Sequence, residues 1–267
     1  MTNCAHWQVY ALRYAINHNQ RASQNFIGGD AHDGPMPLDY FVWLVLRGDQ
    51  AIVVDTGFDR TMAEKRGREH LGCPSDTLRR MGVNPDTIRD VILTHLHYDH
   101  AGNHALFPAA RFHVQDREMA YATGRAMTHG ALRAAYEADD VAVMVYRIFA
   151  DRVRFHDGDW ELMPGISVHR IGGHTDGLQV VRVWTERGWI VLASDASHFY
   201  ANMETSRSFP IVYHVGDMME GFRRLRELAD GQNAIIPGHD PLVMHRYLPP
   251  SPDLEGMVVR LDRPPLC

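Results

Sequence analysis

Residues 94–103 read THLHYDHAGN and directly follow a short apolar segment at positions 91–93. The stretch holds ligand-type side chains at four of six consecutive positions: His95, His97, Asp99 and His100. The segment VILTH (91–95) predicts a buried strand, so these side chains would lie where the chain leaves a sheet. His95 and His97 alternate on an extended segment and can project the same way, whereas Asp99 and His100 follow as the chain turns. One stretch could therefore serve two adjacent metal ions, and imidazole and carboxylate without thiolate suit Zn²⁺ or a related divalent ion.

Three more ligand-type residues follow predicted strands elsewhere in the chain. The motif GGHTDG carries His174 after the segment ISVHRI, and LASDAS carries Asp195 at the end of the apolar segment WIVLA. IIPGHD places His239 in the same position relative to a third apolar segment. One histidine alone needs no functional explanation, but ligand-type residues at the ends of several strands together indicate a metal centre.

The rest of the pattern predicts an α/β fold. We expect strands over residues 7–15, 40–58, 91–95, 110–115, 152–156, 166–171, 178–184, 189–195 and 234–237, with 40–58 a hairpin around the turn RGDQ. Helices are expected over 60–82 with a break near 72–75, over 116–138, and over 215–230, ending at Gly231. Residues 17–39 form a long polar loop. This order predicts a four-layer αββα sandwich, two sheets with helices on their outer faces, in a single domain over 1–267.

Composition excludes several classes of partner. The chain has 33 acidic and 27 basic residues, a formal charge of −6, so it lacks the basic surface of a nucleic-acid-binding protein. No apolar run approaches the roughly 20 residues that cross a bilayer, and the first residues do not resemble a signal peptide. Three widely spaced cysteines, Cys4, Cys73 and Cys267, argue against a disulfide framework. We therefore expect a cytoplasmic protein without a nucleic-acid or membrane partner.

The motifs resemble those of a known family. THLHYDHAG matches the H-x-H-x-D-H signature of the metallo-β-lactamase superfamily, and VVDTG at 53–57 matches the turn that precedes it in that fold. GGHTDG resembles the usual P-G-H-T-x-G, with Gly172 in place of proline. Asp195 and His239 fit the remaining ligand motifs, so the resemblance covers nearly the whole chain in the expected order.

The resemblance implies a role for each residue. His95, His97 and His174 would hold one metal ion, Asp99, His100 and His239 would hold a second, and Asp195 would bridge the two. Asp55 resembles a residue that supports the ligand loop, although it can equally be a simple turn residue. Zn²⁺ is the default for this ligand set, and Co²⁺, Mn²⁺ or Fe²⁺ would fit it.

Within the superfamily, the chain looks most like the N-acyl-homoserine lactonase branch. A bridging carboxylate suits lactonases and thioester hydrolases, and the length, the loop at 17–39 and the helical insertion after ARFHVQ (110–115) resemble the lactonases. Those enzymes carry a tyrosine three residues past the bridging aspartate, where it hydrogen-bonds the lactone carbonyl. Here DASHFY places His198 at that position and Tyr200 two residues later. An imidazole can also donate a hydrogen bond to a developing oxyanion.

The reaction implied is hydrolytic opening of a lactone ring. A hydroxide shared by two metal ions, which can lower the pKa of water to about 7, would attack the carbonyl. Asp99 would transfer the proton to the leaving oxygen, and His198 would be a second donor to the carbonyl. Two alternatives stay open: a hydrolase of the same fold acting on another ester, carbamate or β-lactam, and a non-catalytic metal-binding protein. A homodimer is plausible by resemblance, with the loop at 17–39 as an interface.

The pocket could be partly apolar. Aromatic and apolar residues that are either core or pocket flank the motifs: Phe26, Met36, Tyr40, Trp43, Phe199, Tyr200 and Tyr213. The segment SFPIVYH (208–214) could line the acyl or leaving-group side.

Overall fold

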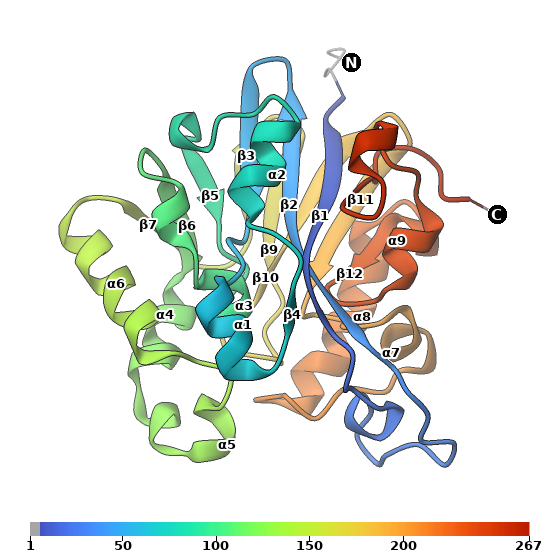
Figure 1. Ribbon diagram of the computed structural model, residues 1–267. Helices are drawn as coiled ribbons and strands as arrows, with labels where there is room; N and C mark the ends of the chain where they lie inside the picture. Colours follow the sequence, from blue (N-terminus) through green and yellow to red (C-terminus); the bar gives the residue numbers. More distant parts are fainter. Residues whose placement is uncertain (1–5, 267) are drawn as a thin grey trace.

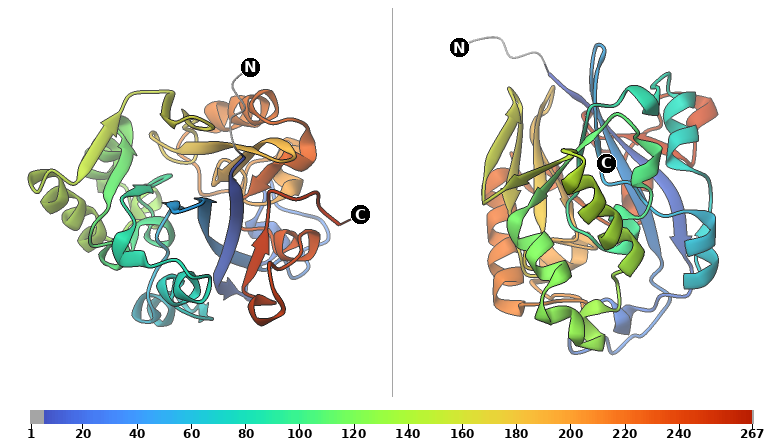
Figure 2. Two further views of the ribbon diagram at one scale, coloured as in Figure 1. Left: turned by 90° about the horizontal axis from the view of Figure 1, so that it is seen from above. Right: turned by 90° about the vertical axis from the view of Figure 1, so that its left-hand side faces the viewer.

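The computed structural model describes residues 6–266, and Cys4 and Cys267 lie outside that range. Two β-sheets face each other, and helices cover the outer side of each sheet (Figures 1 and 2). This arrangement confirms the predicted αββα sandwich. Within the described range, no helix is both long and apolar enough to cross a membrane.

The first sheet has strands in the order β13-β1-β2-β3-β5-β6-β7, with β4 pairing β1 at one end. Its strands are β1 (Gln8–Asn17), β2 (Leu38–Arg47), β3 (Gln50–Val54), β4 (Glu69–His70), β5 (Asp90–Ile92), β6 (Arg111–Gln115), β7 (Val153–His156) and β13 (Val258–Arg260). β1, β2 and β3 pair antiparallel, whereas β3, β5, β6 and β7 run parallel. The parallel strands bring their carboxyl ends to one edge, where the loop after β5 begins.

The second sheet has the order β12-β11-β10-β9-β8. Its strands are β8 (Trp160–Met163), β9 (Ile166–Arg170), β10 (Gln179–Thr185), β11 (Gly188–Ser194) and β12 (Ile235–Pro237). β11 and β12 pair in parallel, so the residues that follow them, Asp195 and His239, leave the sheet side by side.

Residues 6–266 contain nine α-helices. They are α1 (Arg60–Arg66), α2 (Pro74–Arg80), α3 (Tyr98–Ala101), α4 (Asp116–Thr123), α5 (Gly130–Arg133), α6 (Ala138–Phe149), α7 (Tyr200–Thr205), α8 (Val215–Leu228) and α9 (Leu242–Arg246). In Figure 2, α8 in orange lies on the outer side of one sheet and α1 and α2 in teal on the outer side of the other. The two-residue period of β1 shows why the layers stack: Val9 and Ala11 face the second sheet, and Leu12 and Tyr14 face the helices.

The prediction of one helix over 116–138 is wrong. The chain forms α4, a 3₁₀ turn at Arg125–Thr128 and α5, and then begins α6 at Ala138. Gly124 ends α4 in an extended conformation, and a β-carbon there would lie 2.5 Å from the carbonyl oxygen of Ala120. The break within 60–82 is also wider than predicted, because β4 occupies 69–70 before α2 starts at Pro74. Sequence analysis also missed α7, α9, β8 and β13.

Candidate metal centre

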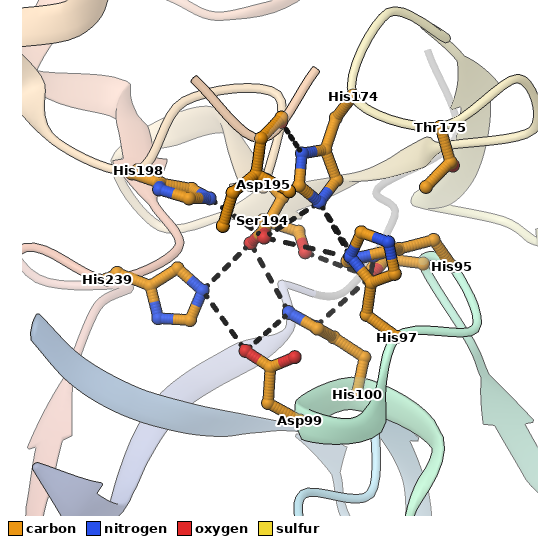
Figure 3. Close-up of polar contacts among 12 residues, drawn as sticks. His95, His97, Asp99, His100, His174, Thr175, Ser194, Asp195, His198 and His239 are labelled. Atoms are coloured by element: carbon orange, nitrogen blue, oxygen red, sulfur yellow. Dashed lines mark hydrogen bonds and ion pairs between the residues drawn. The ribbon is translucent and has the colours of Figure 1, made fainter. Parts of the chain in front are cut away.

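The ligand-type residues that the sequence singled out converge on one buried cluster (Figure 3). The structure brings together all seven expected ligands, none more than 8% exposed: His95, His97, Asp99, His100, His174, Asp195 and His239. Ligand atoms of His95, His97, His174 and Asp195 lie within 4.8 Å of one another, as do those of Asp99, His100 and His239. We call His95, His97 and His174 the first half of the centre, and Asp99, His100 and His239 the second half. Asp195 is treated separately, because it contacts both halves.

Asp195 faces both halves with different oxygens. Its Oδ2 lies 3.2 Å from His174 Nε2 and 3.8 Å from His95 Nε2. Its Oδ1 lies 3.0 Å from His239 Nε2 and 3.3 Å from His100 Nε2. The two oxygens of Asp195 therefore face different groups of histidines.

The first half presents three imidazole nitrogens to one another. His97 Nδ1 lies 3.0 Å from His95 Nε2 and 2.9 Å from His174 Nε2, and the last two atoms are 3.2 Å apart. Burial, followed by the neighbouring imidazoles, holds the pKa of His95 and His97 well below the usual value, so both rings are neutral at neutral pH. Lone pairs facing one another at this distance suit a cation between them.

The outward ring nitrogens are held by hydrogen bonds that set the tautomers. His174 Nδ1 donates to the carbonyl oxygen of Ile211 at 2.7 Å, and His239 Nδ1 donates to that of Asp39 at 2.8 Å. A carbonyl only accepts, so Nδ1 carries a proton in each ring, and Nε2 is the nitrogen turned toward the cluster. Such outer hydrogen bonds are the usual support of metal-binding histidines.

Two inward atoms lack hydrogen bonds. His100 Nε2 and Asp195 Oδ1 are fully buried and have no hydrogen-bond partner of acceptable geometry, although they are 3.3 Å apart. Buried polar groups without partners are costly, and a bound ion would satisfy both atoms. The donor set therefore fits divalent metal ions, and the cluster is suited to binding them.

The second half carries its own negative charge. Asp99 Oδ2 lies 3.5 Å from His100 Nε2 and 3.6 Å from His239 Nε2. Burial alone would raise the pKa of Asp99, but His100 and His239 outweigh burial and lower it. Burial would likewise lower the pKa of His100 and His239, but the carboxylates of Asp195 and Asp99 raise both.

Asp55 supports the loop that carries residues 94–100 through hydrogen bonds. It is fully buried with φ 63°, and its carboxylate accepts from the Thr94 backbone N–H at 2.7 Å and from His100 Nδ1 at 2.7 Å. The Thr94 hydroxyl also donates to it at 2.9 Å. Asp55 therefore orients the His100 ring and holds Thr94, which is the supporting role, one of the two that the sequence left open for it.

Glu118, which sequence analysis missed, supports the opposite side. Its fully buried carboxylate accepts from the backbone N–H of Leu96 at 2.9 Å, the Tyr136 hydroxyl at 2.8 Å, the Thr175 hydroxyl at 2.6 Å and the N–H of Gly177 at 3.2 Å. A β-carbon at position 177 would lie 2.1 Å from the Glu118 nitrogen, so glycine is required there. Glu118 thus ties the His95–His97 loop to the His174 loop. An acidic residue in the first turn of a helix is common, so nothing in the sequence marked it.

His198 lies at the edge of the centre and touches Asp195. Its Nε2 is 3.0 Å from Asp195 Oδ2, and its ring stacks on Phe209 with centroids 3.4 Å apart at 7°. Burial lowers the pKa of His198 to about 4, so the ring is neutral, and Nε2–H donates to the carboxylate, which can only accept. Nε2 also lies near ligand atoms of Asp195 and His239, so geometry alone would permit a ligand role.

A pocket of about 220 Å³ opens over the centre. Tyr40 and Ile211 line it, so Tyr40 and the segment 208–214 belong partly to the pocket, as the sequence allowed. Four other flanking aromatics are core residues: Trp43 between the sheets, and Phe26, Phe199 and Tyr200 buried elsewhere. Tyr213 is 44% exposed and belongs to neither the core nor the pocket lining. The loop at 17–39 reaches this region through Ile27 N–H, which donates to the Ser208 carbonyl at 2.7 Å.

Comparison with known proteins identifies the family. The model of the metallo-β-lactamase superfamily matches residues 36–239. The N-acyl homoserine lactonase AiiA of Bacillus thuringiensis subsp. kurstaki is 30% identical over 220 residues, which cover 76% of this chain and 82% of that protein. A solved quorum-quenching N-acyl homoserine lactone lactonase superimposes with TM-score 0.71 at 24% identity, over 88% of this chain and 92% of its own. A solved probable metal-dependent hydrolase from Staphylococcus aureus gives TM-score 0.74 at 14% identity, over 99% and 96% of the two chains.

The chain belongs to the metallo-β-lactamase superfamily. Among its members it is a hydrolase, similar in sequence to curated N-acyl homoserine lactonases.

Proposed function

We propose that this chain opens lactone rings by hydrolysis at a pair of divalent metal ions, with N-acyl-homoserine lactones as the substrates that its relatives suggest. The observation that carries the proposal is the division of the Asp195 carboxylate between the two halves of the centre. That division suits two ions that share one ligand and stand close enough to act on one substrate.

Bound divalent ions would lower the pKa of a water molecule and polarise the ester carbonyl. Zn²⁺ is the expected ion, and the same ligands would accept Co²⁺, Mn²⁺ or Fe²⁺. The first half would hold one ion through His95, His97 and His174. The second half would hold the other through Asp99, His100 and His239.

Two side chains of this centre would act on the substrate directly. Asp99 lines the pocket, so its carboxylate is placed to take a proton from the attacking water and return it to the leaving ring oxygen. His198 also lines the pocket and carries its N–H on Nε2, the atom that faces Asp195. A short rotation would direct this donor to the oxygen of a bound carbonyl, the role that we propose for it.

The presence of an apolar hollow beside the pocket supports the proposal that the substrate carries an acyl substituent. It lies between α4 and α6, has a volume of about 750 Å³, and is lined by residues such as Ala122, Met127 and Val141. Ala134 lines both the hollow and the pocket. An acyl chain that leaves the pocket past Ala134 would be covered by apolar side chains.

The test is proton release from a panel of substrates by the metal-loaded protein, with and without chelator. Release from lactones that chelator abolishes supports the proposal. Turnover of linear esters, carbamates or β-lactams without turnover of any lactone would contradict it and favour another hydrolase of this fold. No turnover at all with both ions bound would contradict a catalytic role.

A further inference from the structure

One cation in the pocket has no carboxylate to neutralise it. Arg66, the last residue of α1, and Arg68, two residues later, both line the pocket over the metal centre. Among residues 6–266, the acidic residues that line it are Asp99 and Asp195, which both belong to the centre. The charges of the two arginines must therefore be balanced from elsewhere.

Arg66 is balanced by the protein. Its guanidinium pairs with Glu137 at 2.6 Å, donates to the Ala134 carbonyl at 2.8 Å, and lies 4.2 Å above the ring of Tyr98. Lys65 reaches the same carboxylate of Glu137 at 2.7 Å. These contacts join the end of α1 to the segment before α6. They hold Arg66 in place as part of the pocket lining.

Arg68 is different. It is half-buried, and within residues 6–266 no carboxylate oxygen lies within 4.0 Å of its guanidinium. Its buried Nε has no hydrogen-bond partner. Its neighbours are the phenols of Tyr40 and Tyr98, whose oxygens are 3.3 Å apart. A phenol hydroxyl carries no charge at neutral pH, so the two tyrosines do not neutralise Arg68.

The surroundings of Arg68 suit a planar anion. A half-buried guanidinium without a counter-ion costs free energy, and its planar set of N–H donors matches a carboxylate. Tyr40 and Tyr98 add hydroxyl groups beside it. Tyr98 directly precedes Asp99, and the Tyr40 ring packs edge-on against His239 with centroids 5.1 Å apart, so a group bound to Arg68 would lie on the side of the second half.

We propose that Arg68 binds a carboxylate on the substrate, so that this site prefers lactones with an anionic substituent over neutral ones. This inference rests on the proposed lactone hydrolysis. It shifts the expected substrates from neutral lactones, such as N-acyl-homoserine lactones, to lactones that carry a carboxylate, and it does so through a residue outside the metal centre.

The test uses two lactones of nearly equal shape, 5-oxotetrahydrofuran-2-carboxylate and its carboxamide. We expect kcat/KM to be higher for the carboxylate by about 10- to 100-fold, the range of a charge-assisted hydrogen bond. Metal ions also attract carboxylates, so the comparison that decides is between variants. Arg68→Gln should lower the ratio of the two kcat/KM values at least tenfold, and Arg68→Lys should keep part of it. Arg60→Gln, a change of an exposed arginine at the start of α1, is the matched control and should keep the whole ratio.

A binding measurement separates this inference from the proposed function. Calorimetry on the metal-loaded protein with tetrahydrofuran-2-carboxylate and tetrahydrofuran-2-carboxamide requires no turnover. We expect tighter binding of the carboxylate and loss of that preference in Arg68→Gln but not in Arg60→Gln. A carboxylate preference that Arg68→Gln leaves unchanged, or no preference in the wild type, overturns the inference even if neutral lactones are hydrolysed. A preference that depends on Arg68 without hydrolysis of any lactone would overturn the proposed function alone.

Discussion

The two halves of the metal centre are built from different chemistry. The first half consists of imidazoles, and burial keeps His95 and His97 neutral. The second half contains the carboxylate of Asp99, and the nearby carboxylates raise the pKa of His100 and His239 despite burial. Each half also has its own support, Glu118 for the first and Asp55 for the second. Two separate frameworks therefore meet at one cluster, and the Asp195 carboxylate lies between them.

We expect the largest effect from removing Asp195, the carboxylate that faces both halves. Asp195→Ala deletes an oxygen from each half, so we expect loss of at least one ion and a greater fall in kcat/KM than the roughly 10²–10³-fold that loss of one transition-state donor costs. Metal analysis and turnover on the same preparation check this. Asp176→Ala, which changes a carboxylate on the outer side of the His174 loop, is the control and should keep both ions. A fully active variant with two ions would show that Asp195 is not shared.

His198→Ala tests whether His198 is a metal ligand or a hydrogen-bond donor to the substrate. We expect turnover to fall about 10²–10³-fold while both ions stay bound, because the variant removes a donor and no ligand. The measurement pairs kcat with metal content. Loss of an ion would assign His198 to the second half as a ligand, together with Asp195 and His239.

The two supports can be tested separately. Glu118→Gln places an amide where four donors need an acceptor, so it should weaken the first half, and Asp55→Asn should weaken the second. Removal of such outer partners typically costs about 10- to 100-fold in metal affinity. A calorimetric titration with Zn²⁺ should show a different binding step weakened in each variant. If both variants weaken the same step, the division into halves is wrong.

The smallest expected effect lies outside both halves. Burial, and then the charges of Glu137 and Asp139, raise the pKa of Asp140 in α6 from 3.8 to about 7. The folded protein therefore holds a proton that the unfolded chain releases, so this group makes stability fall as pH rises from about 4 to about 7. Asp140→Asn should flatten that part of the Tm–pH profile, with metal content unchanged. Identical profiles for wild type and variant would contradict the assignment.

The sequence predicted the fold, and it singled out the residues that the structure brings together, because several of them follow a strand by one to three residues. A strand of apolar residues fixes where its last side chain emerges, and His95, Asp195 and His239 each follow such a strand. The patterns at 7–15 and 40–58 likewise indicated a strand and a hairpin, and the structure places β1, β2 and β3 there.

The supports and the pocket wall could not be predicted in this way. Glu118 meets Leu96 and Thr175 across separations of 22 and 57 residues, and no local pattern encodes such a meeting. Arg68 resembles a surface arginine until Tyr40 and Tyr98 are placed beside it. The stacking of His198 on Phe209 depends on the path of the loop between α7 and α8. In each case the information lies in tertiary contacts, which local periodicity does not carry.

The most direct test of the central claim is the metal content of the protein at saturation, measured together with lactone hydrolysis as chelator is added. We expect two divalent ions per chain, and loss of ring-opening activity as they are removed. Saturation at one ion per chain with full activity, or lactone hydrolysis that persists after both ions are removed, would contradict it.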